Sequence, residues 1–209
     1  MNDHAAVPPA GGPLSLYIHE AAKRRLDLYS AECPLEISGV GEVWLVPGAS
    51  GNPIVISQVF LLEQVSSHAH TELTAGGLAS LLGERAAAGL PSESIRLWWH
   101  SHAAMPAFWS ATDEAAISSF NYVGWLVSIV TNRRGEILAR LDIFPSTSQP
   151  LRRTFAAALI ELPHSDEEER AEVRAEIQRK VRRARVPRTP EVRVAVTAAS
   201  ARRNWRRSA

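Results

Sequence analysis

Two histidines one residue apart, followed by an aspartate, are the residues whose types and spacing favour metal chemistry. His100 and His102 end the segment Ile95–His102, whose branched and aromatic side chains predict a strand. Because side chains alternate faces along a strand, both imidazoles would point the same way and could hold one ion. Asp113 follows eleven residues later, at the predicted start of a helix. Two imidazoles and one carboxylate form a catalytic zinc set that leaves one coordination position open for water.

Two further polar residues would complete this site. Ser110 precedes Asp113 by three positions, so both share one face of a first helical turn, and the hydroxyl could donate to a developing oxyanion. Glu36 lies between Leu35 and Ile37, an apolar setting that would raise the pKa of its carboxyl. Such a carboxyl suits a general base that later protonates a leaving amine. Zinc would assist by lowering the pKa of water to about 7.

Simpler explanations exist for several of these residues. A serine followed three residues later by an acid, as in Ser110 and Asp113, also resembles a capping box at a helix start. That explanation needs no metal, but it does not account for the paired histidines at the matching distance. Glu32 and Glu42 lie close to Glu36 in the sequence and are alternative carboxylates for the general base.

Other histidines and tryptophans near the motif have weaker patterns. His68 and His70 form a second His-x-His pair before a predicted helix, and we expect solvated loop residues there. No cysteine–histidine cluster accompanies them, which argues against a structural zinc site. Trp98 shares its strand face with His100 and should border the site, whereas Trp99 should face the opposite side.

The spacing of the motif resembles that of the JAMM (JAB/MPN-plus, Mov34-like) metallopeptidase family. The family pattern is an upstream glutamate, then His-Ser/Thr-His, seven residues, a serine, two residues and an aspartate. Here His100 and His102, with a serine between them, are followed by seven residues, Ser110, two residues and Asp113. The resemblance extends over about residues 14–145, and the fixed intervals make the motif specific.

The resemblance implies a role for each residue. The zinc ligands would be His100, His102 and Asp113. Glu36 would be the general acid and base, because its apolar–Glu–apolar–x–Gly context best matches the family's glutamate, and Ser110 would support the tetrahedral intermediate. Family members hydrolyse peptide or isopeptide bonds after the C-terminal glycine of ubiquitin or ubiquitin-like proteins, and bacterial relatives process ubiquitin-like or sulfur-carrier proteins.

The resemblance also implies partners and an alternative function. The aromatic residues that surround the motif look like those of the bacterial subgroup, so the expected substrate is a ubiquitin-like or sulfur-carrier protein. An E1-like adenylating enzyme would then act in the same pathway. The alternative is a non-catalytic MPN-type interaction scaffold, as family members that lack the metal ligands are.

Strands and helices are intermixed around these residues. Strands are predicted at about Glu42–Val46, Ile54–Leu62, Ile95–His102, Trp125–Val130 and Ile137–Phe144. Helices are predicted at about Ser15–Ser30, Glu72–Ala88, Ser110–Phe120, Leu151–Leu162 and Asp166–Arg185. The turn Asn132–Gly135 makes the last two strands a hairpin. The expected class is α/β (α+β) with a mixed β-sheet flanked by helices, and the resemblance implies the MPN/JAB (cytidine-deaminase-like) architecture.

Length and charge indicate one domain with tails. The 209 residues are expected to divide into a flexible leader (1–13), a catalytic domain (14–162), and a charged helix with a basic, disordered tail (163–209). Residues 166–209 carry a net charge of +6 and the remainder −5. Arginine-rich tails attract nucleic acid, but no nucleic-acid fold surrounds this one, so a solvated tail is expected.

The compartment is expected to be the cytoplasm. Cys33 is the single cysteine, so no internal disulfide can form, and we expect it to be a buried small hydrophobe. No apolar run reaches the ~18 residues that a membrane span needs. The first residues lack the basic start and apolar core of a signal peptide.

Overall fold

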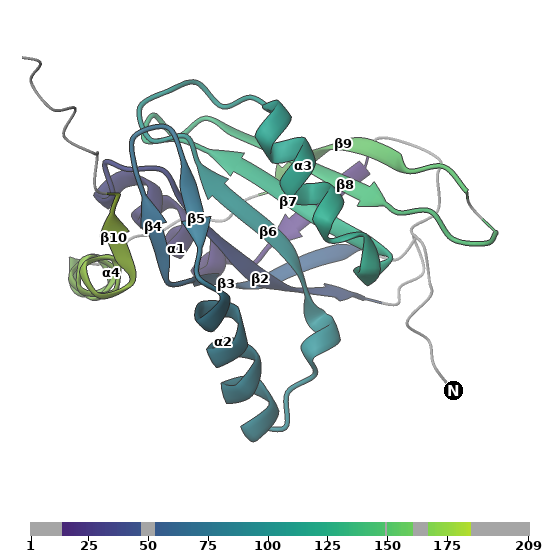
Figure 1. The fold of residues 1–209 in the computed structure, drawn as a ribbon, viewed down its shortest axis with the longest axis horizontal. Coiled ribbons are helices and arrows are strands. Elements are labelled where there is room, and N and C mark those ends of the chain that lie inside the picture. The colour runs from purple at the N-terminus through teal and green to yellow at the C-terminus, as the bar shows by residue number, and fades with distance from the viewer. Residues whose placement is uncertain (1–13, 47–52, 149, 161–166, 185–209) are drawn as a thin grey trace, which may run out of the picture.

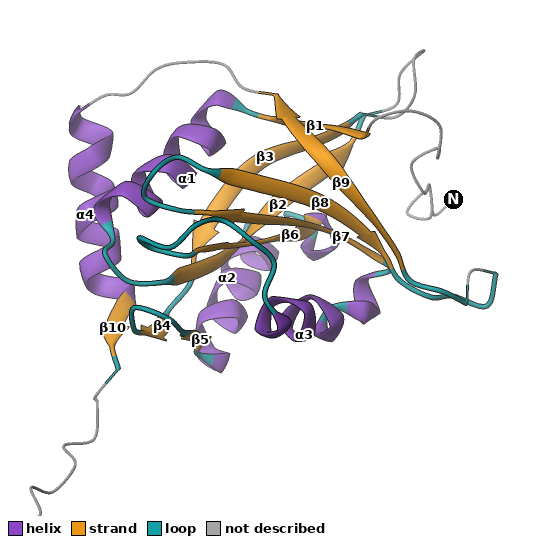
Figure 2. Cartoon of the chain, turned by 90° about the horizontal axis from the view of Figure 1, so that it is seen from above, coloured by secondary structure: helices purple, strands orange, loops and turns teal. Residues whose placement is uncertain are grey.

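Seven strands of the computed structural model close into a barrel, with a small three-stranded sheet beside it (Figures 1 and 2). The structure describes residues 14–46, 53–148, 150–160 and 167–184. In spatial order, the barrel strands are β1 (Leu14–Ile18), β3 (Ile54–Leu61), β2 (Ile37–Leu45), β6 (Ile95–Ser101), β7 (Trp125–Thr131), β8 (Ile137–Ile143) and β9 (Arg153–Ile160). The small sheet holds β10 (Val181–Arg183), β4 (Gln64–Ser66) and β5 (Thr71–Leu73).

Four α-helices surround these strands. They are α1 (Glu20–Glu32), α2 (Ala75–Ala87), α3 (Ala111–Ser119) and α4 (Glu167–Lys180). Seen from above, α1 and α4 lie at one end of the barrel, and α2 and α3 lie along the side that carries β6 (Figure 2). Two short 3-10 helices, Ser92–Ser94 and Asn121–Val123, lead into β6 and β7.

The expected α/β (α+β) class, with a mixed sheet flanked by helices in the MPN/JAB architecture, is wrong. Of two segments predicted as helices, one begins with a strand before its helix and the other is a strand. The segment Ser15–Ser30 begins within β1 before α1 starts, and the segment Leu151–Leu162 contains β9. These two strands pair with one another in parallel, and their pairing closes the sheet into a barrel. Leu16 and Ile18 are buried at alternate positions, which is the period of a strand rather than of a helix.

Most of the other predicted elements are confirmed with shifted ends. The strands β3, β6, β7 and β8 lie where they were predicted, and β7 and β8 form the expected antiparallel hairpin. Gly135 in its turn has φ +80°, a conformation that favours glycine. The helix expected from Glu72 begins later, at Ala75, because Glu72 belongs to β5. Arg174 of α4 donates to Glu32 of α1 at 2.6 Å, so the charged helix contacts the body of the protein. The expected leader and basic tail lie outside the described residues.

The interior of the barrel is built around Trp99. This side chain is fully buried, and its ring stacks on Tyr29 of α1 with centroids 5.5 Å apart. Gly39 pairs with Trp99 across β2 and β6. A Cβ atom at Gly39 would lie 2.0 Å from the carbonyl oxygen of Phe60 and 2.7 Å from the Trp99 ring, so only glycine fits there. Cys33 is buried in the same core, as expected.

A buried ion pair fastens α2 to the barrel. Arg85 of α2 donates to the carboxylate of Glu42 on β2 and, at 2.9 Å, to the hydroxyl of Ser94. Ser57 donates to the second oxygen of Glu42 at 2.9 Å. Burial alone would raise the pKa of the Glu42 carboxyl, but these hydrogen bonds outweigh it and hold the pKa below its ordinary value. The ion pair therefore stabilises the folded state when Glu42 is ionised.

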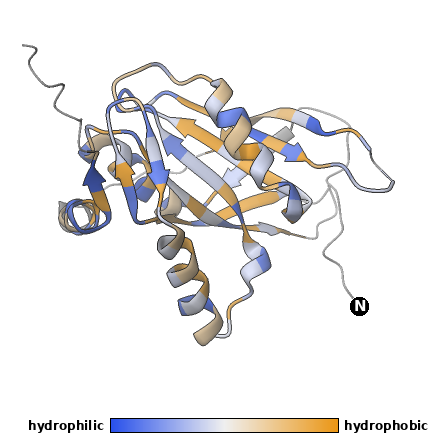
Figure 3. Cartoon of the chain, in the orientation of Figure 1, coloured by the Kyte–Doolittle hydropathy of each residue, from blue (hydrophilic) through white to orange (hydrophobic). Residues whose placement is uncertain are grey.

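The outermost helix differs from the strands in polarity. Figure 3 shows α4 as largely hydrophilic, whereas the barrel strands carry most of the hydrophobic positions.

Among the described residues, no helix combines the length and apolar character that crossing a membrane requires.

We expect the substitution Glu42→Gln to lower the free energy of unfolding at pH 7 by about 3 kcal/mol, because it leaves Arg85 buried without a charged partner. The folded-state pKa of Glu42 is below the ordinary 4.5, so its contribution is complete above pH 4.5 and disappears as the pH falls through the folded value. Urea unfolding at several pH values should show the difference between the two proteins shrinking below pH 4.5.

The matched control is Glu84→Gln, which removes an exposed carboxylate from the same helix and should change the free energy of unfolding by less than about 0.5 kcal/mol. A difference between wild type and Glu42→Gln that stays constant down to acidic pH would contradict the assignment.

Candidate metal centre and its pocket

The three predicted ligands converge in the folded chain. The ligand atoms of His100, His102 and Asp113 lie within 4.8 Å of one another, and all three residues are buried. Nε2 of His100 is 3.1 Å from Oδ1 of Asp113, and Nε2 of His102 is 3.6 Å from Oδ2 of the same carboxylate. Donors about 2.0–2.2 Å from a tetrahedral zinc are separated from each other by about 3.3 Å. The arrangement therefore has the dimensions of a site for one divalent ion.

The hydrogen bonds around the two imidazoles fit a metal ion. Neither ring nitrogen of His100 has a hydrogen-bond partner among the described residues, although Nε2 lies close to Asp113. The two groups approach each other without the direction of a hydrogen bond, as ligands of a shared ion do. Nδ1 of His102 lies 3.0 Å from the carbonyl oxygen of Pro106, which can only accept. That nitrogen therefore carries the proton, and the lone pair on Nε2 remains for a metal.

The electrostatics favour the protonation states that a metal requires. Burial lowers the pKa of His100, so its imidazole is neutral at pH 7. Burial alone would raise the pKa of the Asp113 carboxyl, but its contacts with His100 and Ser110 outweigh this and hold the pKa at about 2. Neutral imidazole and ionised carboxylate are the ligand forms that bind divalent ions.

The strand β6 positions His100, and His102 follows directly after its last residue. It lies between β2 and β7, where His100 pairs with Ser38 on one side and Val130 on the other. The alternation predicted from the sequence holds, because the ring of Trp98 stacks on His100 at 4.5 Å while Trp99 occupies the core. Both imidazoles therefore project from the outer surface of the barrel rather than into its interior.

The turn of the β7–β8 hairpin holds the loop after β6. The backbone N–H of His102 donates to the carbonyl of Thr131 at 2.8 Å. The side chain of Asn132, which is 1% exposed, donates to the carbonyl of Met105 at 2.8 Å. Ala103 adopts φ 50°, in the left-handed region, as the chain leaves the strand. These contacts fix the path of the chain from the histidine pair to Ser110.

The helix α3 begins with a capping box that includes the predicted metal ligand Asp113. The backbone N–H of Ser110 donates to Oδ2 of Asp113 at 2.6 Å, and the N–H of Asp113 donates to the hydroxyl of Ser110 at 3.2 Å. The other carboxylate oxygen, Oδ1, faces His100. The capping box is therefore present, and it leaves one carboxylate oxygen of Asp113 facing the histidine pair.

A cavity of about 470 Å³ opens over the cluster. It is lined by the predicted ligands, by Glu36 and Ser110, and by residues of β5 and α3. Glu36 is 8% exposed, and burial raises the pKa of its carboxyl against the opposing effect of His102. Glu32 and Glu42 are paired with Arg174 and Arg85 and do not line this cavity. Of the three carboxylates weighed from the sequence, only Glu36 reaches the site.

The sequence did not indicate that His70 lines this cavity. His70 is exposed, as expected of a loop residue, but it lines the same cavity as Glu36. The link is the short β4–β5 hairpin, whose Ser67 carbonyl accepts the backbone N–H of Glu36 at 2.9 Å. The His-x-His pattern at 68 and 70 was the available signal, but local sequence could not show that this hairpin folds over the site. His68 is not among the residues that line the cavity.

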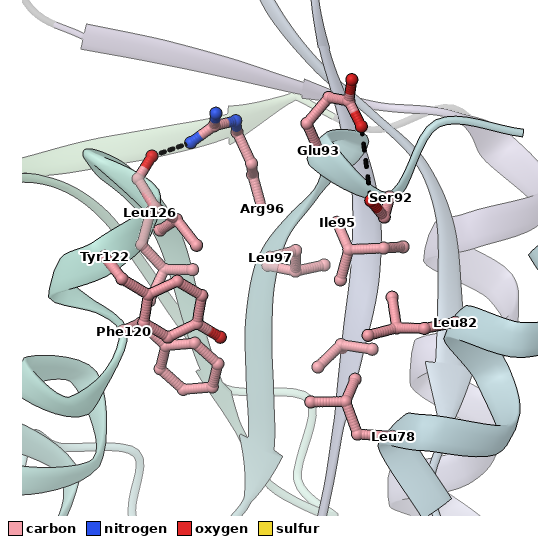
Figure 4. Close-up of a pocket in the computed structure, with 12 residues that line it drawn as sticks. Leu78, Leu82, Ser92, Glu93, Ile95, Arg96, Leu97, Phe120, Tyr122 and Leu126 are labelled. Carbon is pink, nitrogen blue, oxygen red and sulfur yellow. Dashed lines mark hydrogen bonds between the residues drawn. The ribbon is translucent and has the colours of Figure 1, made fainter. Parts of the chain in front are cut away.

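A second, apolar pocket shares Phe120 with the first. Leucines of α2, including Leu78 and Leu82, form one wall, and Tyr122 and Leu126 form the other (Figure 4). Among the described residues that line it, no group is suited to binding a metal.

Comparison with protein-family models and with curated proteins gives no match for this chain. Functional conclusions therefore depend on the residues and geometry of the cavity.

We expect the purified protein to bind one zinc ion per chain and His102→Ala to lose that binding, because the substitution removes one of three ligands. His68→Ala is the matched control, since it removes an exposed histidine of the other His-x-His pair and should leave zinc binding unchanged. Metal content after dialysis and titration calorimetry measure both. Equal zinc content in wild type and His102→Ala would show that the ion binds elsewhere.

Proposed function

We propose that this protein is a zinc-dependent hydrolase of the JAMM type that cleaves a peptide or isopeptide bond. The observation that supports this most is the convergence of His100, His102 and Asp113 in a cavity that Glu36 and Ser110 also line. The spacing of these residues is that of the family motif. The barrel differs from the architecture that the resemblance implies, so the proposal depends on the site rather than on the fold.

His100, His102 and Asp113 would hold the ion. Zinc in a site with three protein ligands keeps a position open, lowers the pKa of water to about 7 and polarises a carbonyl group. The remaining steps belong to side chains of the cavity. Glu36 would take a proton from the attacking water and later give it to the departing amine.

The environment of Glu36 suits this double role. Burial raises the pKa of the Glu36 carboxyl above its ordinary value and so brings it closer to neutral pH. A carboxyl with such a pKa can both accept and donate a proton during the reaction. Its backbone is held by the hydrogen bond to the Ser67 carbonyl, at the point where the chain enters β2. A carboxyl on such a fixed segment stays oriented toward the cavity while it exchanges a proton.

Ser110 would stabilise the negative oxygen of the tetrahedral intermediate. Its hydroxyl oxygen accepts the backbone N–H of Asp113, and a hydroxyl can donate its own proton at the same time. Its place on the cavity wall and at the N-terminus of α3 puts a hydrogen-bond donor beside the positive end of a helix dipole.

The walls of the cavity suit an extended polypeptide. Its lining combines polar groups from β5 and the preceding turn, including His70 and Glu72, with the apolar side chains of Met105, Phe108 and Phe120. As the motif implies, we propose that the substrate is the C-terminal tail of a ubiquitin-like or sulfur-carrier protein, in a cytoplasmic pathway with an E1-like adenylating enzyme.

The substitution Glu36→Gln should retain zinc but reduce hydrolysis by about 10²–10⁴-fold, because it removes the proton acceptor and leaves the three ligands in place. The assay is cleavage of a ubiquitin-like protein fused through its terminal glycine to a reporter, with and without a chelator. Zinc content is measured on the same samples.

Glu72→Gln is the control, since it removes another carboxylate from the wall of the same cavity and should cost less than about tenfold. Undiminished cleavage by Glu36→Gln would refute the role of Glu36. A wild-type protein that binds no zinc would favour the non-catalytic scaffold instead.

A further inference from the structure

A buried arginine lies beneath the start of α3. Arg140 stands in the middle of β8, opposite Ser128 of β7, and only 5% of its surface is exposed. A guanidinium group at such a position requires several compensating contacts. Its Nε donates to Asp142 on the same strand at 2.9 Å, and its two terminal nitrogens donate to the carboxylate of Glu114 on α3.

The contacts of Arg140 lie on both sides of the turn from Ser110 to Asp113. Its guanidinium stacks on the ring of Trp109, 4.4 Å from the centroid, and Trp109 immediately precedes Ser110. Glu114, which takes the bidentate contact, immediately follows Asp113. One side chain therefore holds both ends of the four-residue segment that supplies the helix cap and the carboxylate ligand.

Asp142, which accepts from Nε of Arg140, is itself held in place by further hydrogen bonds. Asp142 is fully buried and accepts hydrogen bonds from Arg152 at 2.8 Å and from Thr154 at 2.6 Å. Arg152 also donates to Glu114 at 3.3 Å. Because Asp142 is held by Arg152 and Thr154, Arg140 cannot move without breaking several charge-assisted hydrogen bonds.

The helix α3 needs such an anchor. It has nine residues, and helices of this length are marginally stable on their own, so tertiary contacts decide where they lie. Its first turn carries Asp113, whose Oδ1 must stay near His100 to share an ion. The contact between Glu114 and Arg140 fixes that turn against the barrel.

We propose that Arg140 and Glu114 are positioning residues for the metal centre, which hold the turn from Ser110 to Asp113 so that the carboxylate faces the histidine pair. This inference rests on the proposed zinc site. Neither residue lines the cavity, so the effect would pass through Asp113 and appear in zinc affinity.

An effect of charge alone and an effect of positioning would change the zinc affinities of Glu114 and Arg140 variants in different ways. If only charge near the ion mattered, Glu114→Gln would weaken zinc binding and Arg140→Gln would strengthen it, because one removes a negative and the other a positive group. Positioning predicts that both substitutions weaken binding. Arg140→Lys separates the two further, since lysine keeps the charge but cannot make the bidentate, stacked contact.

The experiment measures zinc affinity by competition with a chromophoric chelator on the full chain. We expect Glu114→Gln, Arg140→Gln and Arg140→Lys each to bind zinc about tenfold more weakly than wild type. The double variant Glu114→Gln with Arg140→Gln should be no weaker than about the weaker single variant, because both remove the same contact.

The matched control is Arg85→Gln, which breaks the buried ion pair with Glu42 that anchors α2. It should lower the Tm of the metal-free protein while leaving zinc affinity within about twofold of wild type. A merely structural role for Arg140 would give the same result as this control.

The outcomes are distinct. If wild type binds zinc and Glu114→Gln and Arg140→Lys bind it equally well, the positioning role is overturned and the zinc site stands. Tighter binding by Arg140→Gln overturns it as well. If wild type binds no zinc, the proposed function and this inference both fall. If Arg140→Gln does not fold, Glu114→Gln and Arg140→Lys decide the question, because the side chain of Glu114 is 45% exposed and lysine preserves the buried charge.

Discussion

Two imidazoles and a carboxylate are buried within 4.8 Å of one another, and such groups need a compensating partner when they leave water. The described residues do not supply all of these partners, because both ring nitrogens of His100 lack a hydrogen bond. A divalent ion would satisfy this demand for all three groups together. This cluster is the place where the loop after β6, the first turn of α3 and Glu36 come together.

The barrel provides the rigidity that such a cluster needs. The interior face of β6 is fixed by Trp99, which fills the space that the bare backbone of Gly39 leaves open. The exterior face of the same strand then presents His100 and Trp98 at a defined angle. A closed sheet has no free edge along which β6 could slip by one residue, and a slip would send both histidines into the core.

The ligands could be predicted from sequence because their geometry is local. His100 and His102 follow the two-residue period of a strand, and Ser110 and Asp113 follow the first turn of a helix. The closure of the barrel could not be predicted, because β1 has only five residues and β9 holds a run of alanines, and such segments fit either period until their pairing is known. The contact between Arg140 and Glu114 could not be predicted either, because the two residues lie 26 positions apart in the sequence.

The double role of the capping box limits what each substitution can reveal. Replacing Ser110 would remove a proposed oxyanion donor, but it would also remove the acceptor for the N–H of Asp113 and loosen the start of α3. A loss of activity would then have two causes. Glu36 is different, because its side chain takes no part in a helix cap and its backbone hydrogen bond would survive substitution. The proton-transfer step is therefore isolated most cleanly at Glu36, and the geometry of the ligand turn at Arg140 and Glu114.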